Sequence, residues 1–530
     1  MKKRKRLLLT GTMLLLLLCN SFWLLAQQKI TGKVTDATGK PLQGVTVSLK
    51  LKQTVTVTTG DGVFQINALP GDVLEFTSVG YLSKQQKVGT APLTIELNTM
   101  ASSLDEVVVV GYGTSKKKDL TGSVATVSSK DFQKGQISTP EQMIAGKLPG
   151  VSVISNGGQP GSGSTIRIRG GSSLRASNDP LIVIDGVPLD NNSISGAGNP
   201  LSFINPNDIE SFTVLKDASA AAIYGTRASN GVILITTKKG TGGKLKMNFV
   251  TTLSSSTITK KVDVLTADQL REIVNARGTA AQKAMLGTAN TDWQNEIYQT
   301  ALATDNNLTL SGGIKKLPYR VSLGYTNQNG VLLTDNLQRT SAAVVINPVL
   351  FNNHLKIDLN LKGSMQQTRF ANTGAIGGAV SFDPTQPVFG DKNSTRFGGY
   401  YEWLDPASAT GLVNLAGRNP VGLLEQRLDK SAPIRSIGNL QLDYKFHFLP
   451  ELRANLNMGY DLSRGTGTVY VSDSAASDYV AGGAGGQNNT YKQTRQNRIF
   501  DFYLNYAKDI RALKSRADLT VGYSYNNFQY

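Results

Sequence analysis

The chain has 530 residues, a formal net charge of +17 and only 18% charged residues, while 40% are apolar and 54 are glycine. This composition is too apolar and too weakly charged for a disordered protein, and the glycines lack the three-residue period of collagen. With one cysteine (Cys19) and two histidines (His354 and His447), a disulfide framework, a Cys/His zinc site and a Cys–His nucleophile pair are all disfavoured. We therefore expect a protein that is not an enzyme and that needs no metal or other cofactor.

Residues 1–26 predict a secretory signal peptide. Five basic residues precede an apolar stretch from Leu7 to Leu25, and the small Ala26 is followed by two glutamines. An uncleaved membrane anchor is the alternative, because the apolar stretch approaches the length of a spanning helix. After residue 26 no apolar run is that long, so a membrane-embedded mature chain would have to be a barrel. Its basic excess would face anionic lipid headgroups or acidic ligands rather than nucleic acid.

Residues 27–100 show short alternating strands separated by turn signals. Thr46–Leu49 alternates between polar and apolar residues, and turns are indicated at Thr38–Pro41 and Gly60–Gly62. Six or seven such strands in one short span predict a small Greek-key β-sandwich.

Residues 101–118 differ in character from the sandwich. Four consecutive valines, Val107–Val110, lie between acidic residues and the sequence Gly111-Tyr112-Gly113. Because β-branched side chains favour extended backbone, we expect a strand. From the residues alone it is equally a tethered strand, the last strand of the sandwich or a strand between domains.

Residues 119–243 mix helix and strand signals. We expect a helix over 138–149, with Pro140 in its first turn, and a second over 217–224, closed by Gly225. Strands are expected over 164–169, 181–185 and 231–237. The pattern indicates a compact α/β unit, whose many glycines and asparagines predict a small apolar core.

Residues 244–530 are dominated by a two-residue period. Leu355, Ile357, Leu359 and Leu361 alternate with polar residues, and the same pattern recurs over 319–325, 440–448, 452–460, 500–506 and 519–525. A soluble sandwich would also alternate. Short turns that pair the strands, between long polar excursions over 366–434 and 465–495, favour a transmembrane barrel. His354 and His447 fall on different strands without further ligands, so we expect them to fill surface or lumen positions.

The order of these parts resembles the SusC/RagA family of TonB-linked (TonB-dependent) outer membrane proteins, and residues 27–100 resemble a carboxypeptidase-regulatory-like domain. The TonB-box resemblance rests on Asp105, Glu106, Val107, Val108, Val109 and Val110. The plug resemblance rests on Arg167, Arg169, Gly170, Asp185, Gly186, Asp217, Tyr224, Gly225 and Arg227.

The resemblance implies a mainly β fold: a carboxypeptidase-regulatory-like sandwich (27–100), a TonB-box segment (101–118), an α/β plug domain (119–243) and the first strands of a truncated transmembrane β-barrel (244–530). It implies active import of a bulky nutrient, an oligosaccharide or a peptide, through the cell outer membrane, with the sandwich in the periplasm. The implied partners are outer-membrane lipid, a SusD-like surface lipoprotein and TonB of the inner-membrane TonB–ExbB–ExbD complex, without nucleic acid.

Two other functions compete with this interpretation. A non-transporting scaffold or adhesin would need neither a TonB box nor plug motifs. A TonB-dependent siderophore or vitamin receptor would share both of them.

Three further expectations follow from the sequence. About nine barrel strands, against roughly 22 in plugged transporters, predict the N-terminal part of a longer protein. The loop Gly157–Gly163 lacks the Lys-Ser/Thr ending of a phosphate loop, so we expect the apex of the plug. Arg167, Arg169 and Arg175 are expected to pair with carboxylates of the barrel lumen that the full chain supplies, and the alternative is a clamp on an anionic ligand.

Overall fold

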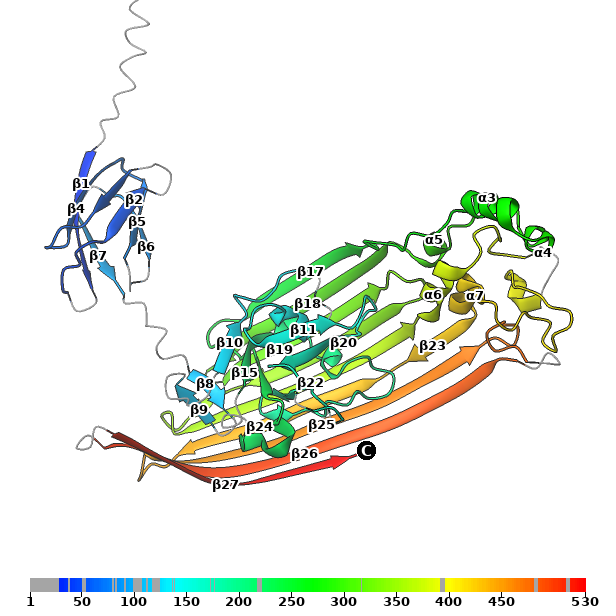
Figure 1. The fold of residues 1–530 in the computed structure, drawn as a ribbon. Coiled ribbons are helices and arrows are strands. Elements are labelled where there is room, and N and C mark those ends of the chain that lie inside the picture. The colour runs from blue at the N-terminus through cyan, green and yellow to red at the C-terminus, as the bar shows by residue number, and fades with distance from the viewer. Residues whose placement is uncertain are drawn as a thin grey trace, which may run out of the picture. The chain divides into compact units, whose positions relative to one another are not determined.

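The computed structural model (Figure 1) describes most of the chain after the predicted signal peptide, which lies outside the described residues. The described residues are 28–36, 39–49, 54–78, 81, 83–89, 92–98, 107–110, 113–116, 124–135, 137, 139–171, 173–175, 177–216, 222–315, 317–390, 396–480, 485–510 and 515–530. The chain divides into two compact units, one that holds the sandwich and one that holds everything from Leu120 onward.

The first unit is a β-sandwich of seven strands, as predicted. The strands are β1 (Gln28–Asp36), β2 (Thr46–Leu49), β3 (Val55–Val57), β4 (Val63–Ala68), β5 (Val73–Thr77), β6 (Lys84–Lys87) and β7 (Leu93–Leu97). One sheet has the order β4-β1-β7 and the other β3-β2-β5-β6. Alternate side chains point inward, so that Phe64 and Phe76 meet edge to face with ring centroids 5.3 Å apart.

We expect the sandwich to fold alone, because it has its own buried core. An isolated fragment of residues 27–100 should unfold cooperatively in urea. Phe64→Ala should lower its free energy of unfolding by about 3–5 kcal/mol, since the ring is 1% exposed. Lys40→Ala, at an exposed turn, is the matched control and should change it by less than about 0.5 kcal/mol. A fragment without a cooperative transition would contradict the prediction.

The plug consists of two sheets with short helical turns. Its strands are β10 (Val124–Ser128), β11 (Val151–Ser155), β12 (Ser164–Ile168), β13 (Leu181–Ile184), β14 (Val187–Pro188), β15 (Ile209–Leu215) and β16 (Val232–Thr237). Five strands form a sheet of order β10-β15-β16-β13-β14, and β11 pairs with β12. The turns are the 3-10 helices η4 (Pro140–Ile144), η5 (Pro200–Phe203), η6 (Pro206–Asp208) and η7 (Ala222–Ala228).

One expectation about the helices of the plug was wrong. The predicted helix over 138–149 is only η4, because the backbone of Ala145 (ψ 123°) has left the helical region and Gly146 takes a positive φ of 70°. Most of the second expected helix, residues 217–221, lies outside the described residues. Its described end belongs to η7, which has a non-helical backbone at Gly225, the residue expected to close the helix.

The apolar core of the plug is also larger than its glycine and asparagine content suggested, since those residues lie mainly in loops. Its core side chains include Ile144, Ile184, Leu189, Leu201, Ile209, Phe212 and Val214, each at most 1% exposed.

The rest of the chain forms one eleven-stranded antiparallel sheet. It has nine long strands, the number expected, and two short ones, β21 and β23. The strands are β17 (Lys246–Ser256), β18 (Ala301–Ile314), β19 (Leu317–Asn329), β20 (Asn336–Ile346), β21 (Val349–Leu350), β22 (Leu355–Phe370), β23 (Arg427–Ser431), β24 (Ile434–Lys445), β25 (Leu452–Val471), β26 (Gln487–Ile510) and β27 (Ser515–Gln529).

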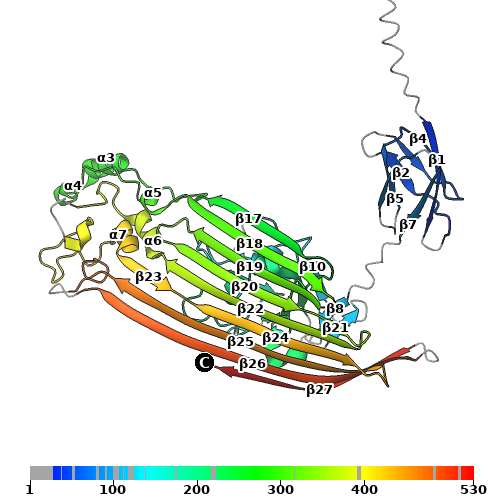
Figure 2. The same cartoon turned by 180° about the vertical axis from the view of Figure 1, so that it is seen from behind.

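Long connections gather at one end of this sheet and short ones at the other (Figure 2). The long connections carry α3 (Ala267–Arg277), α4 (Ala280–Ala284), α5 (Trp293–Ile297), α6 (Gly374–Ser381), η8 (Arg396–Gly399) and α7 (Pro420–Glu425). We call this the helix end of the sheet. Among the described residues, no helix is long and apolar enough to cross a membrane.

The polar excursion expected over 465–495 is mostly strand. β25 continues to Val471, and β26 starts at Gln487 and runs for 24 residues. A strand needs only about 9–11 residues to cross a bilayer, so its outer part has no need of an apolar face and loses the alternating pattern. The connection over 257–300, with three helices, was not anticipated.

Candidate functional site

The large sheet has an inverted pattern of burial. On β22, the apolar Leu361 and Met365 are 40% and 61% exposed. The polar Ser364 and Gln366, which flank Met365, are only 7% and 3% exposed. The plug lies on one face of the sheet only, in both views (Figures 1 and 2). This covered, polar face is called the wall face. The opposite, apolar face is of the kind that meets lipid in membrane barrels.

Three buried ion pairs join carboxylates of the plug to the wall face, and a more exposed fourth pair joins Lys239 of the plug to Asp358 of β22. Asp185 pairs with Lys362 of β22 at 2.5 Å, Asp190 with Arg495 of β26 at 2.7 Å, and Asp208 with Arg320 of β19 at 2.8 Å. No side chain of the six is more than 17% exposed. These three pairs are therefore largely desolvated, and in each of the three the carboxylate belongs to the plug.

Asp185 and Gly186 form the two-residue turn between β13 and β14. Both have positive φ, 47° and 85°, as a type I′ hairpin turn requires and as Asp-Gly readily supplies. The Asp185 carboxylate also accepts hydrogen bonds from the Thr237 backbone N–H (2.9 Å) and hydroxyl (2.7 Å). Burial alone would raise the pKa of Asp185, but Lys362 and these donors hold its pKa below the usual value.

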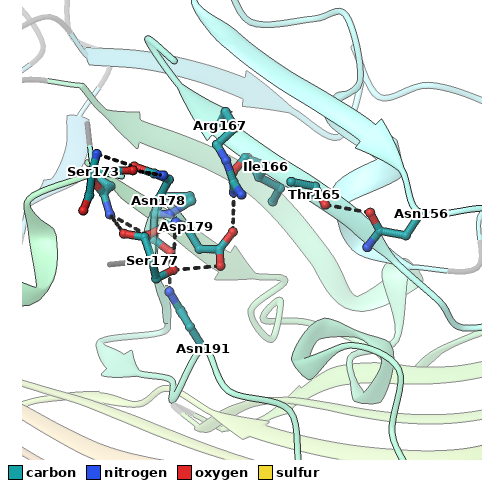
Figure 3. Close-up of polar contacts among 11 residues, drawn as sticks. Asn156, Thr165, Ile166, Arg167, Ser173, Ser177, Asn178, Asp179 and Asn191 are labelled. Carbon is teal, nitrogen blue, oxygen red and sulfur yellow. Dashed lines mark hydrogen bonds and ion pairs between the residues drawn. The ribbon is translucent and has the colours of Figure 1, made fainter. Parts of the chain in front are cut away.

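Arg167 was expected to pair with lumen carboxylates that the full chain supplies, but among the described residues it pairs within the plug. Its guanidinium pairs with Asp179 inside the plug and donates to the Ile166 carbonyl at 2.8 Å (Figure 3). Asp179 is held in turn by the Ser177 hydroxyl at 2.9 Å. The loop after β12 folds back and brings its own carboxylate. The three buried plug–wall pairs have the opposite polarity to the one expected, with the carboxylate on the plug.

The other residues of the plug motif are dispersed. Arg169 and Gly170 have positive φ in the turn after β12, and the Arg169 N–H donates to the Gly150 carbonyl at 2.9 Å. Tyr224 and Gly225 belong to η7, as does Arg227, whose guanidinium lies 4.9 Å from the centroid of the Phe528 ring. Asp217 is outside the described residues. The motif thus maintains turns and contacts rather than one convergent site, and its functional role stays a prediction.

The predicted TonB-box segment is described in part. Val107–Val110 form strand β8, which pairs with β9 (Gly113–Lys116) in a two-stranded sheet. Asp105 and Glu106 lie outside the described residues. The extended conformation expected from the four valines is present, and the role of the segment stays a prediction.

The loop Gly157–Gly163 of the plug lies against the helix end of the sheet. The Gln159 side chain donates to Asp335, in the turn between β19 and β20, at 3.3 Å. A Cβ built on Gly161 would meet Leu337 at 3.0 Å. These contacts agree with the expected position at the apex of the plug.

A cleft of about 1220 Å³ opens among the long connections at this same end. Its lining includes Trp293, Phe382 and Trp403, and Tyr401 packs edge to face on both Phe382 and Trp403. Sequence reasoning missed this feature, because its aromatic residues come from segments about 90 to 110 residues apart. Their spacing carries no periodic signal.

Glu402 in the same connections predicts a pH dependence. Its side chain accepts from the Asn419 N–H at 3.0 Å, while the other oxygen is buried without a partner among the described residues. Burial raises its pKa to about 7. A raised pKa stabilises the folded loop below pH 4.5, and that stability is lost as the pH rises through about 7. Proteolysis within 371–426 should therefore be roughly tenfold faster at pH 8 than at pH 6.

Glu402→Gln should remove most of that difference, because glutamine keeps the hydrogen bond but does not titrate. Glu425→Gln is the matched control, since Glu425 is far more exposed. Equal cleavage rates at both pH values in the unmodified protein would contradict the assignment.

The two histidines, which lie 93 positions apart in the sequence, meet at the end of the sheet that has the short turns. The rings of His354 and His447 stack with centroids 3.8 Å apart and planes 7° apart. His354 Nδ1 donates to the Lys445 carbonyl at 2.8 Å. Within the described part of the chain, no three His, Cys, Asp or Glu side chains are placed to hold a metal ion.

Comparison with known proteins gives matches along the whole chain. The CarboxypepD_reg-like domain family matches residues 30–109, and the TonB-dependent Receptor Plug Domain family matches residues 116–232. The TonB-dependent receptor SusC of Bacteroides thetaiotaomicron is 44% identical over 94% of this chain. The chain belongs to the TonB-dependent receptors of the SusC/RagA type.

Further matches agree with this receptor family. The TonB-dependent receptor P3 of Formosa agariphila is 32% identical over 99% of the chain. The structure of the RagAB peptide importer in the open-open state superposes with a TM-score of 0.62, at 22% identity, over 80% of this chain and 49% of that one. The chain spans about half the length of both curated relatives, 50% of each. These relatives are receptors and not enzymes, which agrees with the expectation that this chain is not an enzyme.

Proposed function

We propose that this receptor imports a bulky nutrient, an oligosaccharide or a peptide, across the cell outer membrane with energy delivered by TonB. The observation that carries the proposal is the way the plug is held against the large sheet. A folded α/β unit is held by buried ion pairs on the polar face of a sheet whose other face is apolar. Such a plug blocks passage until something moves it, so transport needs work.

We infer that the work arrives through Asp105–Val110. An extended segment can be engaged by strand addition, in which backbone hydrogen bonds form with an exposed sheet edge of a partner. The two-stranded sheet of β8 and β9 is small, and isolated hairpins are only marginally stable in water. A partner strand of TonB, within its complex with ExbB and ExbD, can therefore compete for β8 at low cost.

We further propose a SusD-like surface lipoprotein as the partner at the helix end of the sheet, outer-membrane lipid at the apolar face, and the sandwich in the periplasm. The named relatives support this arrangement: one is SusC itself, and RagAB is called a peptide importer. We retain the division into a signal peptide (1–26), sandwich (27–100), TonB-box segment (101–118), plug (119–243) and barrel strands (244–530) as part of the proposal.

A siderophore or vitamin receptor is the second candidate. The ferrienterobactin receptor of Escherichia coli is 32% identical, but over only 26% of this chain. The structural match to the RagAB peptide importer, over 80% of the chain, supports the larger nutrient. A scaffold or adhesin has no use for a plug seated on buried ion pairs.

Uptake in cells with and without TonB tests the proposal. The native receptor is expressed in both backgrounds and supplied with labelled oligosaccharide and peptide mixtures and with a ferric siderophore. We expect receptor-dependent accumulation of an oligosaccharide or a peptide only where TonB is present, while a small porin-permeant solute enters both backgrounds equally. Accumulation that is independent of TonB, or that is confined to the siderophore, would contradict it.

A further inference from the structure

Three basic residues of the wall face depend on the plug for their counter-ions. Arg320, Lys362 and Arg495 pair with Asp208, Asp185 and Asp190. Two other guanidinium groups of the sheet differ in this respect. Arg435 pairs with Asp461 at 2.6 Å, and Arg453 pairs with Asp443, so that both keep a counter-ion on a neighbouring strand.

The register of the strands places the three cations on a diagonal line across the wall face. The row of paired residues that starts at Arg495 continues through Ser463, Arg435, Ser364, Ser341 and Gly324. Lys362 lies two residues from this row on β22, and Arg320 lies four residues from it on β19, both away from the helix end. At about 3.3 Å per residue, the line from Arg495 to Arg320 therefore shifts roughly 13 Å along the strand direction, away from the helix end.

Carboxylates of the wall face near this line already have other partners. Asp358 pairs with Lys239 at 2.9 Å, and Lys239 belongs to the segment that leads covalently into β17. Asp305 accepts from Thr326 and Asn307, and Asp501 accepts from Asn457 and Ser524. Withdrawal of the plug segment over 185–208 therefore leaves Arg320, Lys362 and Arg495 without a paired carboxylate.

We propose that Arg320, Lys362 and Arg495 form an anion track that favours acidic substrates, namely oligosaccharides or peptides that bear carboxylate or sulfate groups. A charge that loses its partner in a poorly hydrated place is costly, and an anion that passes along the track offsets that cost. A row of like charge along a low-dielectric wall also raises the local concentration of the opposite ion. This inference rests on the proposed import function and adds the substrate class.

The test compares acidic with neutral solutes of equal length. The probes are a uronic-acid oligosaccharide with its neutral hexose counterpart, and a glutamate-rich peptide with its glutamine counterpart. Uptake of each is measured in cells that express the native receptor, with the TonB-deficient background subtracted. We expect the acidic member of one pair to be taken up at least roughly tenfold faster than its neutral member, less so at high salt. The pair that shows the preference tells whether the acidic substrate is an oligosaccharide or a peptide.

Charge-swapped variants separate the track from a simple latch. Asp190→Arg with Arg495→Asp restores an ion pair between plug and wall but inverts the charge on the wall, and Asp208→Arg with Arg320→Asp does the same on β19. If the track operates, both swaps reduce the ratio of acidic to neutral uptake at least severalfold. If the pairs only fasten the plug, the swaps leave the ratio unchanged, and the proposal is overturned.

Two further variants keep the outcome interpretable. Arg495→Gln alone should lower the ratio by a smaller factor, and it serves if a swapped receptor does not reach the outer membrane. Arg453→Gln, whose counter-ion lies on the neighbouring strand, should leave the ratio unchanged. If the native receptor shows no TonB-dependent uptake at all, the import function itself is contradicted. If it imports acidic and neutral solutes at equal rates, only the anion track is contradicted.

Discussion

Val108→Pro in the native receptor is expected to reduce uptake to the level of cells that lack TonB. Val108 lies in the middle of β8, and its backbone N–H is one of the groups that a strand-adding partner would use. Proline removes this donor and fixes φ near −65°, which disrupts strand pairing. The measurement is the rate of labelled substrate accumulation, normalised to the amount of receptor in the outer membrane.

Val108→Thr is the matched control. Threonine is β-branched and keeps the N–H, so uptake should remain close to that of the native receptor. Binding of substrate to whole cells should be unchanged in both variants, because the energy-coupling segment is not expected to contact the nutrient. Unchanged uptake in the proline variant would show that these valines do not form the TonB box.

The second large effect is expected at Lys362. Lys362→Met leaves the Asp185 carboxylate buried with only the Thr237 donors, and removal of one partner from a buried ion pair typically costs 3–5 kcal/mol. Native outer-membrane vesicles are exposed to increasing urea and then to protease, and the protected plug is quantified. The midpoint of its loss should move to clearly lower urea.

A second substitution should rescue this defect. Asp185→Asn, which removes the uncompensated charge and tolerates the positive φ of the turn, should restore most of the midpoint when combined with Lys362→Met. Lys356→Met is the matched control on the same strand, because Lys356 is exposed. If Lys362→Met and Lys356→Met behave alike, then the Asp185–Lys362 pair does not hold the plug.

The order of parts along the chain was readable from local patterns. A period of two residues marks strands, and four β-branched valines mark extended backbone, because these signals arise from neighbours in the sequence. The sandwich, the plug strands over 164–168 and 181–184, six of the nine long strands of the large sheet and the approximate number of those strands were therefore predicted. The helix over 138–149 was misjudged, since Gly146 with its positive φ limits it to the short η4.

By itself, the sequence determined which residues alternate, where turns occur and which motifs are present. The tertiary structure alone decided which charges meet: Arg167 turns to Asp179 within the plug, and Lys362 reaches Asp185 across 177 positions. Likewise, His354 and His447 stack only because β22 and β24 pair in register. Charge pairing depends on distances through space, and the long connections that set those distances leave no periodic trace in the sequence.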